Sequence, residues 1–135
     1  MNWTKTHQRW LALICVAYFL IGLVYAWATP PLDASDEFKH YPVVQYIQTT
    51  GQLPVLDPAD PGLWSNEAAQ PPLYYALMAL ATLPFDTSDL EQLHQINTHF
   101  FVGNPHQIRN KNIILHQPAL ENAATSGTVQ AIYVI

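Results

Sequence analysis

The N-terminal part of the chain is dominated by one long apolar run. From Trp10 to Trp27 the sequence reads WLALICVAYFLIGLVYAW, 18 residues with no charged or strongly polar side chain. An α-helix of that length extends about 27 Å, close to the roughly 30 Å hydrocarbon core of a bilayer. Pro30 and Pro31 then end the helix, because neither can donate a backbone hydrogen bond. We therefore predict a transmembrane helix over residues 10–28, preceded by a short segment, residues 1–9.

The residues that flank this run predict its orientation. Lys5 and Arg9 precede it, and all ten acidic residues follow it. By the positive-inside rule, residues 1–9 are cytoplasmic and the chain after Ala28 begins outside the cell (inner or plasma) membrane. Ala26-Trp27-Ala28 also fits the cleavage site of a signal peptide, although the run exceeds the usual h-region of about 7–15 residues. A retained anchor is the favoured interpretation, and a cleaved signal peptide is the alternative.

The segment from Asp33 to Gly51 has the pattern of a helix with a defined end. Its polar residues follow i, i+3, i+4, i+7 spacing, which predicts one stripe containing Asp33, Asp36, Glu37 and His40. Gly51 stands where a C-cap glycine is expected. Pro42 lies between them, so the segment is either one kinked helix or two helices, the second beginning near Pro42.

The chain after Gly51 first becomes rich in turns and then apolar. Residues 52–70 contain several Asp-Pro and Pro-Gly pairs, and we expect an ordered loop with these side chains buried: Leu53, Val55, Leu56, Leu63 and Trp64. Residues 72–84 are almost wholly apolar, but a helix of that length is too short to cross a bilayer. They therefore predict a short helix lying in the membrane interface or packed under another element.

Polar sequence follows this helix. Ser88 and Glu91 have the spacing of a capping box, and residues 97–127 are typical of a loop. Residues 129–135 belong to a new apolar run, where we expect a second transmembrane helix to begin in a chain that is the N-terminal fragment of a longer protein. The predicted fold class is mainly α: one transmembrane helix and then a helical, loop-rich exterior segment over residues 29–128.

Composition excludes several classes of function. Charged residues make up 11% of the chain, against roughly 25% in soluble proteins, and five Lys and Arg leave no basic patch for nucleic acid. One Cys rules out an internal disulfide framework and a cysteine-based zinc site. The six His residues lack the close spacing of a zinc site, so no metal site is predicted.

Two pairs of polar residues are candidates for chemistry. Asp36 and Glu37 are adjacent carboxylates about 100° apart on a helix, so one can face a reacting group while the other binds a cation or orients a neighbour. Glu67 and Gln70 stand just before the apolar helix. Each pair also has a purely structural interpretation, because polar and acidic side chains cap helix starts and favour the helix dipole.

The order of these motifs resembles the beginning of the membrane glycosyltransferases of the GT-C superfamily, in particular the protein mannosyltransferase and aminoarabinose-transferase-like group. The resemblance covers roughly residues 8 to 84. It starts with one membrane helix followed by Pro-x-Asp-x-x-Asp-Glu-x-x-His at residues 31–40. It continues through Val44-x-Tyr46-Ile47 and Gly51-x-Leu53-Pro54 and ends with Glu67-x-x-Gln70-Pro71-Pro72-Leu73-Tyr74-Tyr75.

The resemblance implies transfer of a sugar from a polyprenyl-phosphate carrier to an acceptor on the outer face of the membrane. Mapped residue by residue, it makes Asp36 the catalytic base and places Glu37 beside it to bind the acceptor or a divalent cation. The helix after Pro72 resembles the family's interfacial helix. The residues implied in substrate binding are Glu37, His40, Glu67, Gln70 and Tyr74. The implied partners are the lipid bilayer, the lipid-linked sugar donor and an acceptor whose identity is open.

The sequence also departs from the family pattern. Pro42 interrupts a stretch in which many relatives continue a helix, and only one span is complete, so we expect this chain to be inactive alone. Arg109 is a candidate for binding the carrier phosphate, although a lone arginine in a loop is more often simply solvated. The alternative function, from a different class, is a small membrane-anchored or secreted binding module without catalysis.

Overall fold

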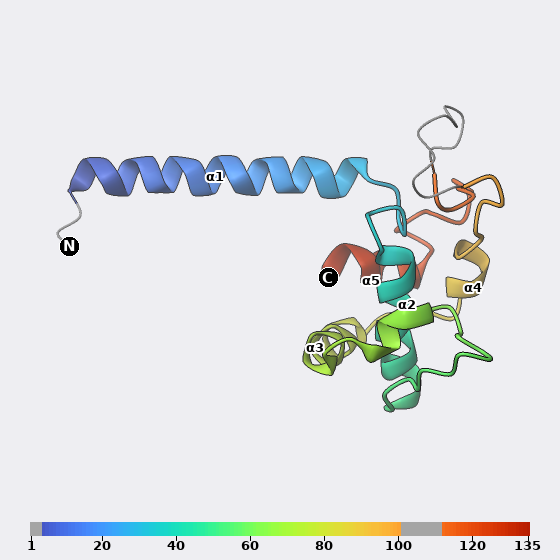
Figure 1. Ribbon diagram of the computed structural model, residues 1–135. Coiled ribbons are helices and arrows are strands. Elements are labelled where there is room, and N and C mark those ends of the chain that lie inside the picture. The colour runs from blue at the N-terminus through green and yellow to red at the C-terminus, as the bar shows by residue number, and fades with distance from the viewer. Residues whose placement is uncertain (1–3, 101–111) are drawn as a thin grey trace. The chain divides into compact units, whose positions relative to one another are not determined.

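The computed structural model describes residues 4–100 and 112–135. The chain divides into two compact units, Met1–Pro30 and Pro31–Ile135, and each is described by itself. Figure 1 shows the elements in chain order: α1 (Lys5–Ala28), α2 (Glu37–Thr50), η1 (Ser65–Ala69), α3 (Pro72–Thr82), α4 (Leu90–Leu93) and α5 (Gly127–Val134). Extended pairing within the described residues is limited to an isolated bridge between Ile96 and Ile114. The prediction of a mainly α chain is confirmed.

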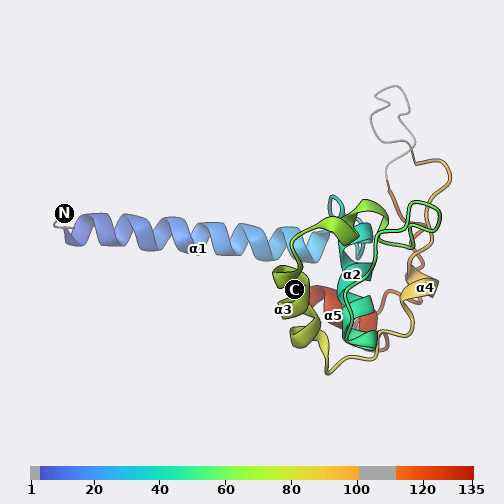
Figure 2. The ribbon, with the colours of Figure 1, turned by 60° about the horizontal axis from the view of Figure 1, so that its bottom comes forward.

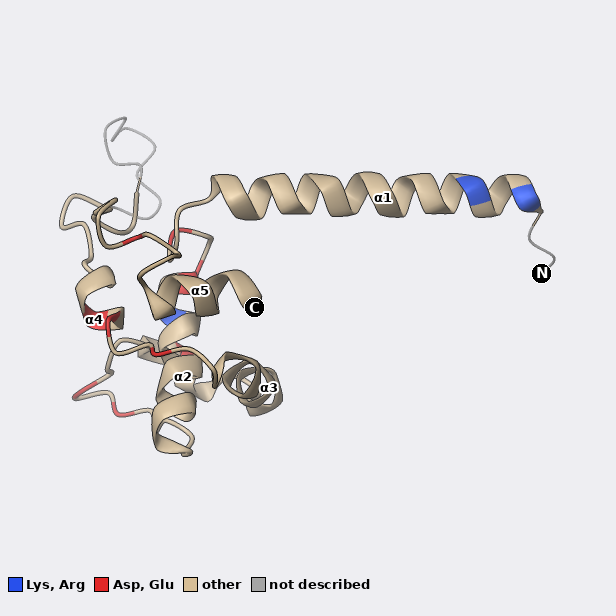
Figure 3. Cartoon of the chain, turned by 180° about the vertical axis from the view of Figure 1, so that it is seen from behind, with Lys and Arg blue, Asp and Glu red and all other residues tan. Residues whose placement is uncertain are grey.

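Helix α1 makes up most of the first unit. Thr4 caps its N-terminus by accepting a hydrogen bond from the His7 N–H, and the Thr29 N–H bonds the Tyr25 carbonyl at its other end. Its 24 residues extend about 36 Å. It is the one helix in the described part of the chain that is long and apolar enough to cross a membrane, a property that a membrane anchor and a signal sequence share. Figure 3 shows the basic residues in its first turns and no acidic residue along it.

Helix α2 is continuous through Pro42, which settles the choice between one helix and two. A proline at this position cannot donate a hydrogen bond to the carbonyl four residues earlier, which belongs to Phe38. That carbonyl is instead paired with His94, whose Nε2 lies 2.5 Å from the Phe38 oxygen. The helix ends at Gly51, whose φ of +68° is the left-handed conformation predicted for a C-cap glycine.

The core of the second unit lies on both sides of α2. Helix α3 packs against α2 and crosses it, since Figure 1 shows α3 nearly end-on where α2 is seen from the side; Figure 2 shows the same pair from another direction. The smaller cluster between these two helices contains Val43, Val44, Tyr75 and Ala79. The larger cluster joins α2 to α4 and α5 and contains Leu32, Tyr41, Leu90, Leu93, Ile114, Val129, Ala131 and Ile132. The apolar run after residue 127 therefore forms a helix with one face in the core.

The capping box predicted for Ser88 and Glu91 does not form. Helix α4 begins at Leu90, and the Ser88 N–H donates to the Asp86 carboxylate. Asp89 occupies the N-cap position, but its carboxylate accepts hydrogen bonds from the N–H and hydroxyl of Thr128 in α5. A contact distant in sequence thus replaces the local cap.

The loop after α2 also differs from its prediction. The side chains of Leu53, Val55, Leu56 and Leu63 are exposed. Trp64 is half-buried and packs edge-on against Tyr46, with ring centroids 4.9 Å apart. The loop crosses the surface of the unit, where few apolar groups are available to cover its side chains.

Candidate functional site

A cavity of about 550 Å³ opens beside the first turns of α2 and α3. Five of the six residues selected from the sequence line it: Asp36, Glu37, His40, Gln70 and Tyr74. They come from two stretches of the chain separated by about thirty residues, and the packing of α3 on α2 brings them together. The backbone segment before α2 contributes Ala34 and Ser35, and Ile135, which directly follows α5, also lines the cavity.

The turn before α2 determines which acidic residues face this cavity. Leu32 and Ser35 have φ angles of 66° and 45°, so both are left-handed and the helix cannot begin before them. Asp33 therefore lies outside the helix, and the predicted four-residue stripe is wrong at this position. Its carboxylate accepts hydrogen bonds from the backbone N–H groups of Ile113 and Ile114.

The two adjacent carboxyl groups have different surroundings. Asp36 is exposed at the N-cap position of α2, and its side chain makes no hydrogen bond or ion pair with any described residue. Glu37 is half-buried, and this burial raises the pKa of its carboxyl group, although hydrogen bonds from the backbone of Leu32 and Ala34 act in the opposite direction. The nearby charge of Asp33 adds to the increase. A carboxyl group with a raised pKa is better matched to accept and return a proton near neutral pH.

His40 is at the centre of a polar network on the α3 side of the cavity. Its Nδ1 lies 2.7 Å from the Tyr75 hydroxyl, and the two rings are stacked with centroids 6.0 Å apart. Its Nε2 lies 3.8 Å from the Glu67 carboxylate. Burial raises the pKa of Tyr75, and the charge of Glu67 adds to this effect. The hydroxyl of Tyr75 therefore stays protonated and can donate to His40.

Glu67 occupies a different position from the other predicted residues. It belongs to η1 and is 5% exposed, and it does not line the cavity. Its carboxylate reaches the site through His40, which is more exposed. Its placement indicates that it orients His40, whereas the resemblance implied a direct role in substrate binding.

Tyr74 and Gln70 form the exposed rim of the cavity. Tyr74 is half-exposed and meets Tyr75 edge-on, with ring centroids 5.4 Å apart. Gln70 ends η1, its backbone N–H bonded to the Glu67 carbonyl, and its side chain is exposed. An exposed aromatic ring, an amide and carboxylates in one cavity offer both a stacking surface and hydrogen-bonding groups to a polyhydroxylated ligand.

The cavity is acidic and its lining contains no Lys or Arg among the described residues. Arg109, the residue considered for binding a phosphate, lies outside the described residues. Those residues also contain no cluster of three His, Cys, Asp or Glu side chains arranged to hold a metal ion. His94 and His116, two of the six histidines, instead hydrogen-bond the protein itself.

Tyr75 is the residue of this site to which the sequence assigned no role of its own. The sequence points to its neighbour Tyr74 in the same Tyr-Tyr pair. The helical period alone cannot say which of the two tyrosines is buried, because that depends on which face of α3 packs against the rest of the unit.

Comparison of the chain with protein-family models, with curated proteins and with solved structures gives no match.

Proposed function

We propose that this chain is the N-terminal part of a GT-C-like membrane glycosyltransferase, and that the cavity beside α2 and α3 binds the acceptor of the sugar. The observation that carries the proposal is the convergence of residues 36–40 and 70–74 on one cavity. Those two stretches hold the motifs on which the resemblance rests.

The chemistry requires a base near the acceptor. The acceptor hydroxyl oxygen forms a bond to C1 of the sugar, the bond between C1 and the carrier phosphate breaks, and its electron pair leaves with the phosphate. The hydroxyl proton passes to a carboxylate of the cavity. The resemblance assigns this role to Asp36, whose exposed carboxylate has no partner among the described residues and can contact a ligand. Glu37 then holds the acceptor, and its raised pKa makes it the second candidate for the base.

The partners of this activity include the bilayer and a polyprenyl-phosphate-linked sugar. Helix α1 would anchor the chain in the cell membrane, with residues 1–9 cytoplasmic and residues 29–128 outside. The outer face of α3 is apolar, with Leu73, Leu77 and Leu80 between 51% and 70% exposed. No charged residue lies between Glu67 and Asp86, so this face can rest in the membrane interface without burying a charge.

The test is a transfer assay on the complete gene product that contains this chain, in membrane vesicles supplied with radiolabelled polyprenyl-phosphate sugars. Asp36→Asn should lower the transfer rate by at least roughly 100-fold, the lower end of what removal of a general base costs. Glu91→Gln is the matched control, since Glu91 is exposed on α4 and lies outside the cavity. Expression and membrane insertion should be unchanged in both variants.

Two outcomes would contradict the proposal. If transfer is unaffected by Asp36→Asn and by Glu37→Gln, neither carboxylate is the base. If the gene product transfers no sugar from any lipid-linked donor, while the chain still binds saccharides in a manner sensitive to Tyr74→Ala, the chain is a membrane-anchored binding module without catalysis.

A further inference from the structure

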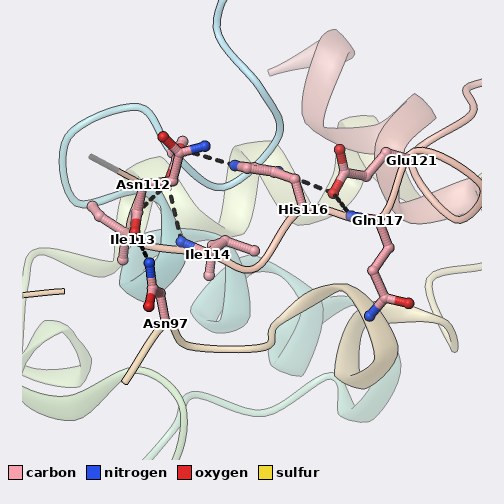
Figure 4. Close-up of polar contacts among 8 residues, drawn as sticks. Asn97, Asn112, Ile113, Ile114, His116, Gln117 and Glu121 are labelled. Atoms are coloured by element: carbon pink, nitrogen blue, oxygen red, sulfur yellow. Dashed lines mark hydrogen bonds and ion pairs between the residues drawn. The ribbon is translucent and has the colours of Figure 1, made fainter. Parts of the chain in front are cut away.

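A second cluster of ionisable groups lies away from the cavity and joins distant parts of the chain. His116 stands between two carboxylates, with Nε2 2.9 Å from Asp33 and Nδ1 2.9 Å from Glu121. The three side chains are only 9–15% exposed. Figure 4 shows His116 directed toward Glu121. Among the described residues, these two carboxylates are the charged groups that face the imidazole.

Both carboxylates are also held by the backbone. Asp33 Oδ1 accepts hydrogen bonds from the N–H groups of Ile113 and Ile114, at 2.8 and 3.2 Å. The Glu121 carboxylate accepts one from the Gln117 N–H at 2.7 Å. Because these contacts fix the positions of the two carboxylates, neither can simply turn away from the imidazole.

This geometry requires a proton on each ring nitrogen. A neutral imidazole has one N–H, so it can donate to one carboxylate only, and its other nitrogen then directs a lone pair at the second. The protonated ring donates to both. Loss of one proton therefore breaks one end of the connection between Asp33 and Glu121 and leaves a repulsive contact.

The Asp33 end of this cluster is attached to the wall of the cavity. Asp33 lies between Leu32 and Ser35, which are both held in the left-handed region. Such conformations cost free energy in residues other than glycine and persist where the surrounding contacts impose them. Ala34 and Ser35 line the cavity, and α2 begins two residues later. The contacts of Asp33 are thus among those that keep this strained wall in place.

We propose that His116 is a pH-dependent latch: its protonated ring joins Asp33 to Glu121 and fixes the cavity wall at Ala34 and Ser35, and deprotonation releases that wall. The latch is independent of the reaction that takes place in the cavity. It makes the affinity of this cavity for a ligand depend on pH by a route separate from the ionisable groups that line the cavity.

The direction of the effect follows from the ionisation of His116. Burial alone lowers the pKa of His116, but the hydrogen bonds and charges of Asp33 and Glu121 outweigh it and raise the pKa above the ordinary value. A group whose pKa is raised in the folded state contributes stability that is complete below its unfolded pKa, about 6.5 for His. That contribution is lost as the pH rises through the folded pKa. The latch is closed in mildly acidic conditions and opens in alkaline ones.

The first test follows His116 and its neighbours by NMR in the full chain, held in detergent micelles or lipid nanodiscs. The pKa of His116 should lie above 6.5. Exchange of the Ile113 and Ile114 amide hydrogens, corrected for the intrinsic effect of pH, should become roughly tenfold faster as His116 deprotonates. His99→Gln is the matched control, since His99 is exposed and should leave both observations unchanged.

Asp33→Asn provides a variant with the opposite sign. The introduced amide keeps an oxygen for the N–H groups of Ile113 and Ile114 but presents an N–H to Nε2 of His116. That nitrogen must now accept, so the ring must be neutral. The pKa of His116 should fall, and the exchange of the two amides should be slower at alkaline pH than at acidic pH.

The cavity wall itself is followed with a spin label at Ser35→Cys in a Cys15→Ser background. The label should become more mobile as the pH rises, and His116→Gln should give the mobile spectrum at every pH. Two results would overturn the latch: a label mobility that does not change with pH in the otherwise natural chain, or a pH dependence that survives in His116→Gln.

Discussion

The pairing of His94 with the Phe38 carbonyl predicts a measurable coupling between two residues far apart in sequence. Pro42 leaves that carbonyl without its helical partner, and His94 supplies the missing donor. His94→Leu fills much of the imidazole volume but donates no hydrogen bond. Pro42→Ala restores a backbone N–H that can bond the Phe38 carbonyl as in an ordinary helix. The His94 donor should therefore matter much less when residue 42 is alanine.

The size of the coupling can be worked out from the contacts. A buried acceptor that loses its partner costs about 1–3 kcal/mol, and His94 is only 9% exposed. The ring contact between Phe38 and His94, with centroids 6.3 Å apart, is lost with either residue at position 42 and cancels in the cycle. His94→Leu should lower the free energy of unfolding by about 2 kcal/mol with Pro42 and by about 1 kcal/mol or less with Pro42→Ala.

The assay is equilibrium unfolding by urea of the full chain in mild detergent micelles, followed by near-ultraviolet circular dichroism of the packed aromatic side chains. His94→Gln is the matched control, because its amide can still donate, and it should cost less than His94→Leu. Equal costs of His94→Leu in the two backgrounds would refute the reasoning, since the carbonyl freed by the proline would then not depend on His94.

Three further predictions concern other parts of the second unit. Burial raises the pKa of Glu37, so ionisation of this carboxyl group opposes folding as the pH rises through that pKa. In urea unfolding, Glu37→Gln should therefore be more stable than the natural chain at pH 7, and the difference should be smaller near pH 4. Gly127→Ala would place its Cβ against the Asp86 carbonyl oxygen, and it should destabilise the second unit by about 3 kcal/mol in the same assay. Gly22→Ala is the control, because its Cβ meets no atom within 4 Å, and it should leave the stability unchanged. Leu77→Asp should weaken the interfacial binding of α3 roughly tenfold, seen as less broadening of α3 amide signals by spin-labelled lipids in nanodiscs; unchanged broadening would place α3 away from lipid.

The elements that short sequence patterns determine could be predicted. Helix α1 extends the predicted apolar span by one polar turn at its start. Helix α3 begins at Pro72, where the proline's fixed φ and missing N–H suit a first turn. Gly51 ends α2 in the left-handed conformation that only glycine adopts without cost. Each of these depends on residues within one or two turns of the chain.

The contacts that connect distant segments could not be predicted in the same way. The spacing of Asp33 predicts a place on a helical stripe, but its carboxylate accepts hydrogen bonds from residues 80 and 81 positions later in the chain. The local capping pattern favours Ser88, yet Asp89 takes the N-cap position and its carboxylate bonds Thr128. A spacing rule considers only hydrogen-bond partners within one segment. It cannot include a donor that the fold brings from a distant part of the chain.

The candidate site was more predictable than these contacts because its residues lie at helix starts. Helix starts concentrate polar residues. Helix α3 packs against α2 so that residues at or near the starts of both helices line the same cavity. Asp36 is the N-cap of α2, and Gln70 lies between the end of η1 and the start of α3. Both residues line the cavity. What the sequence did not give is which side chain of each pair is buried, as with Glu67 and Tyr75.

Three histidines from different segments determine the surroundings of the candidate base. His116 holds Asp33, His94 holds the Phe38 carbonyl, and His40 is itself held by Tyr75. The first turns of α2 and the turn that precedes the helix are thus contacted by imidazole side chains, two of which come from segments far away in the sequence. Of the three acidic residues at this start, Asp33 is paired with His116 and Glu37 accepts backbone hydrogen bonds. Asp36 alone among them makes no side-chain hydrogen bond or ion pair with a described residue, so in a rigid setting it is the carboxylate left for a ligand.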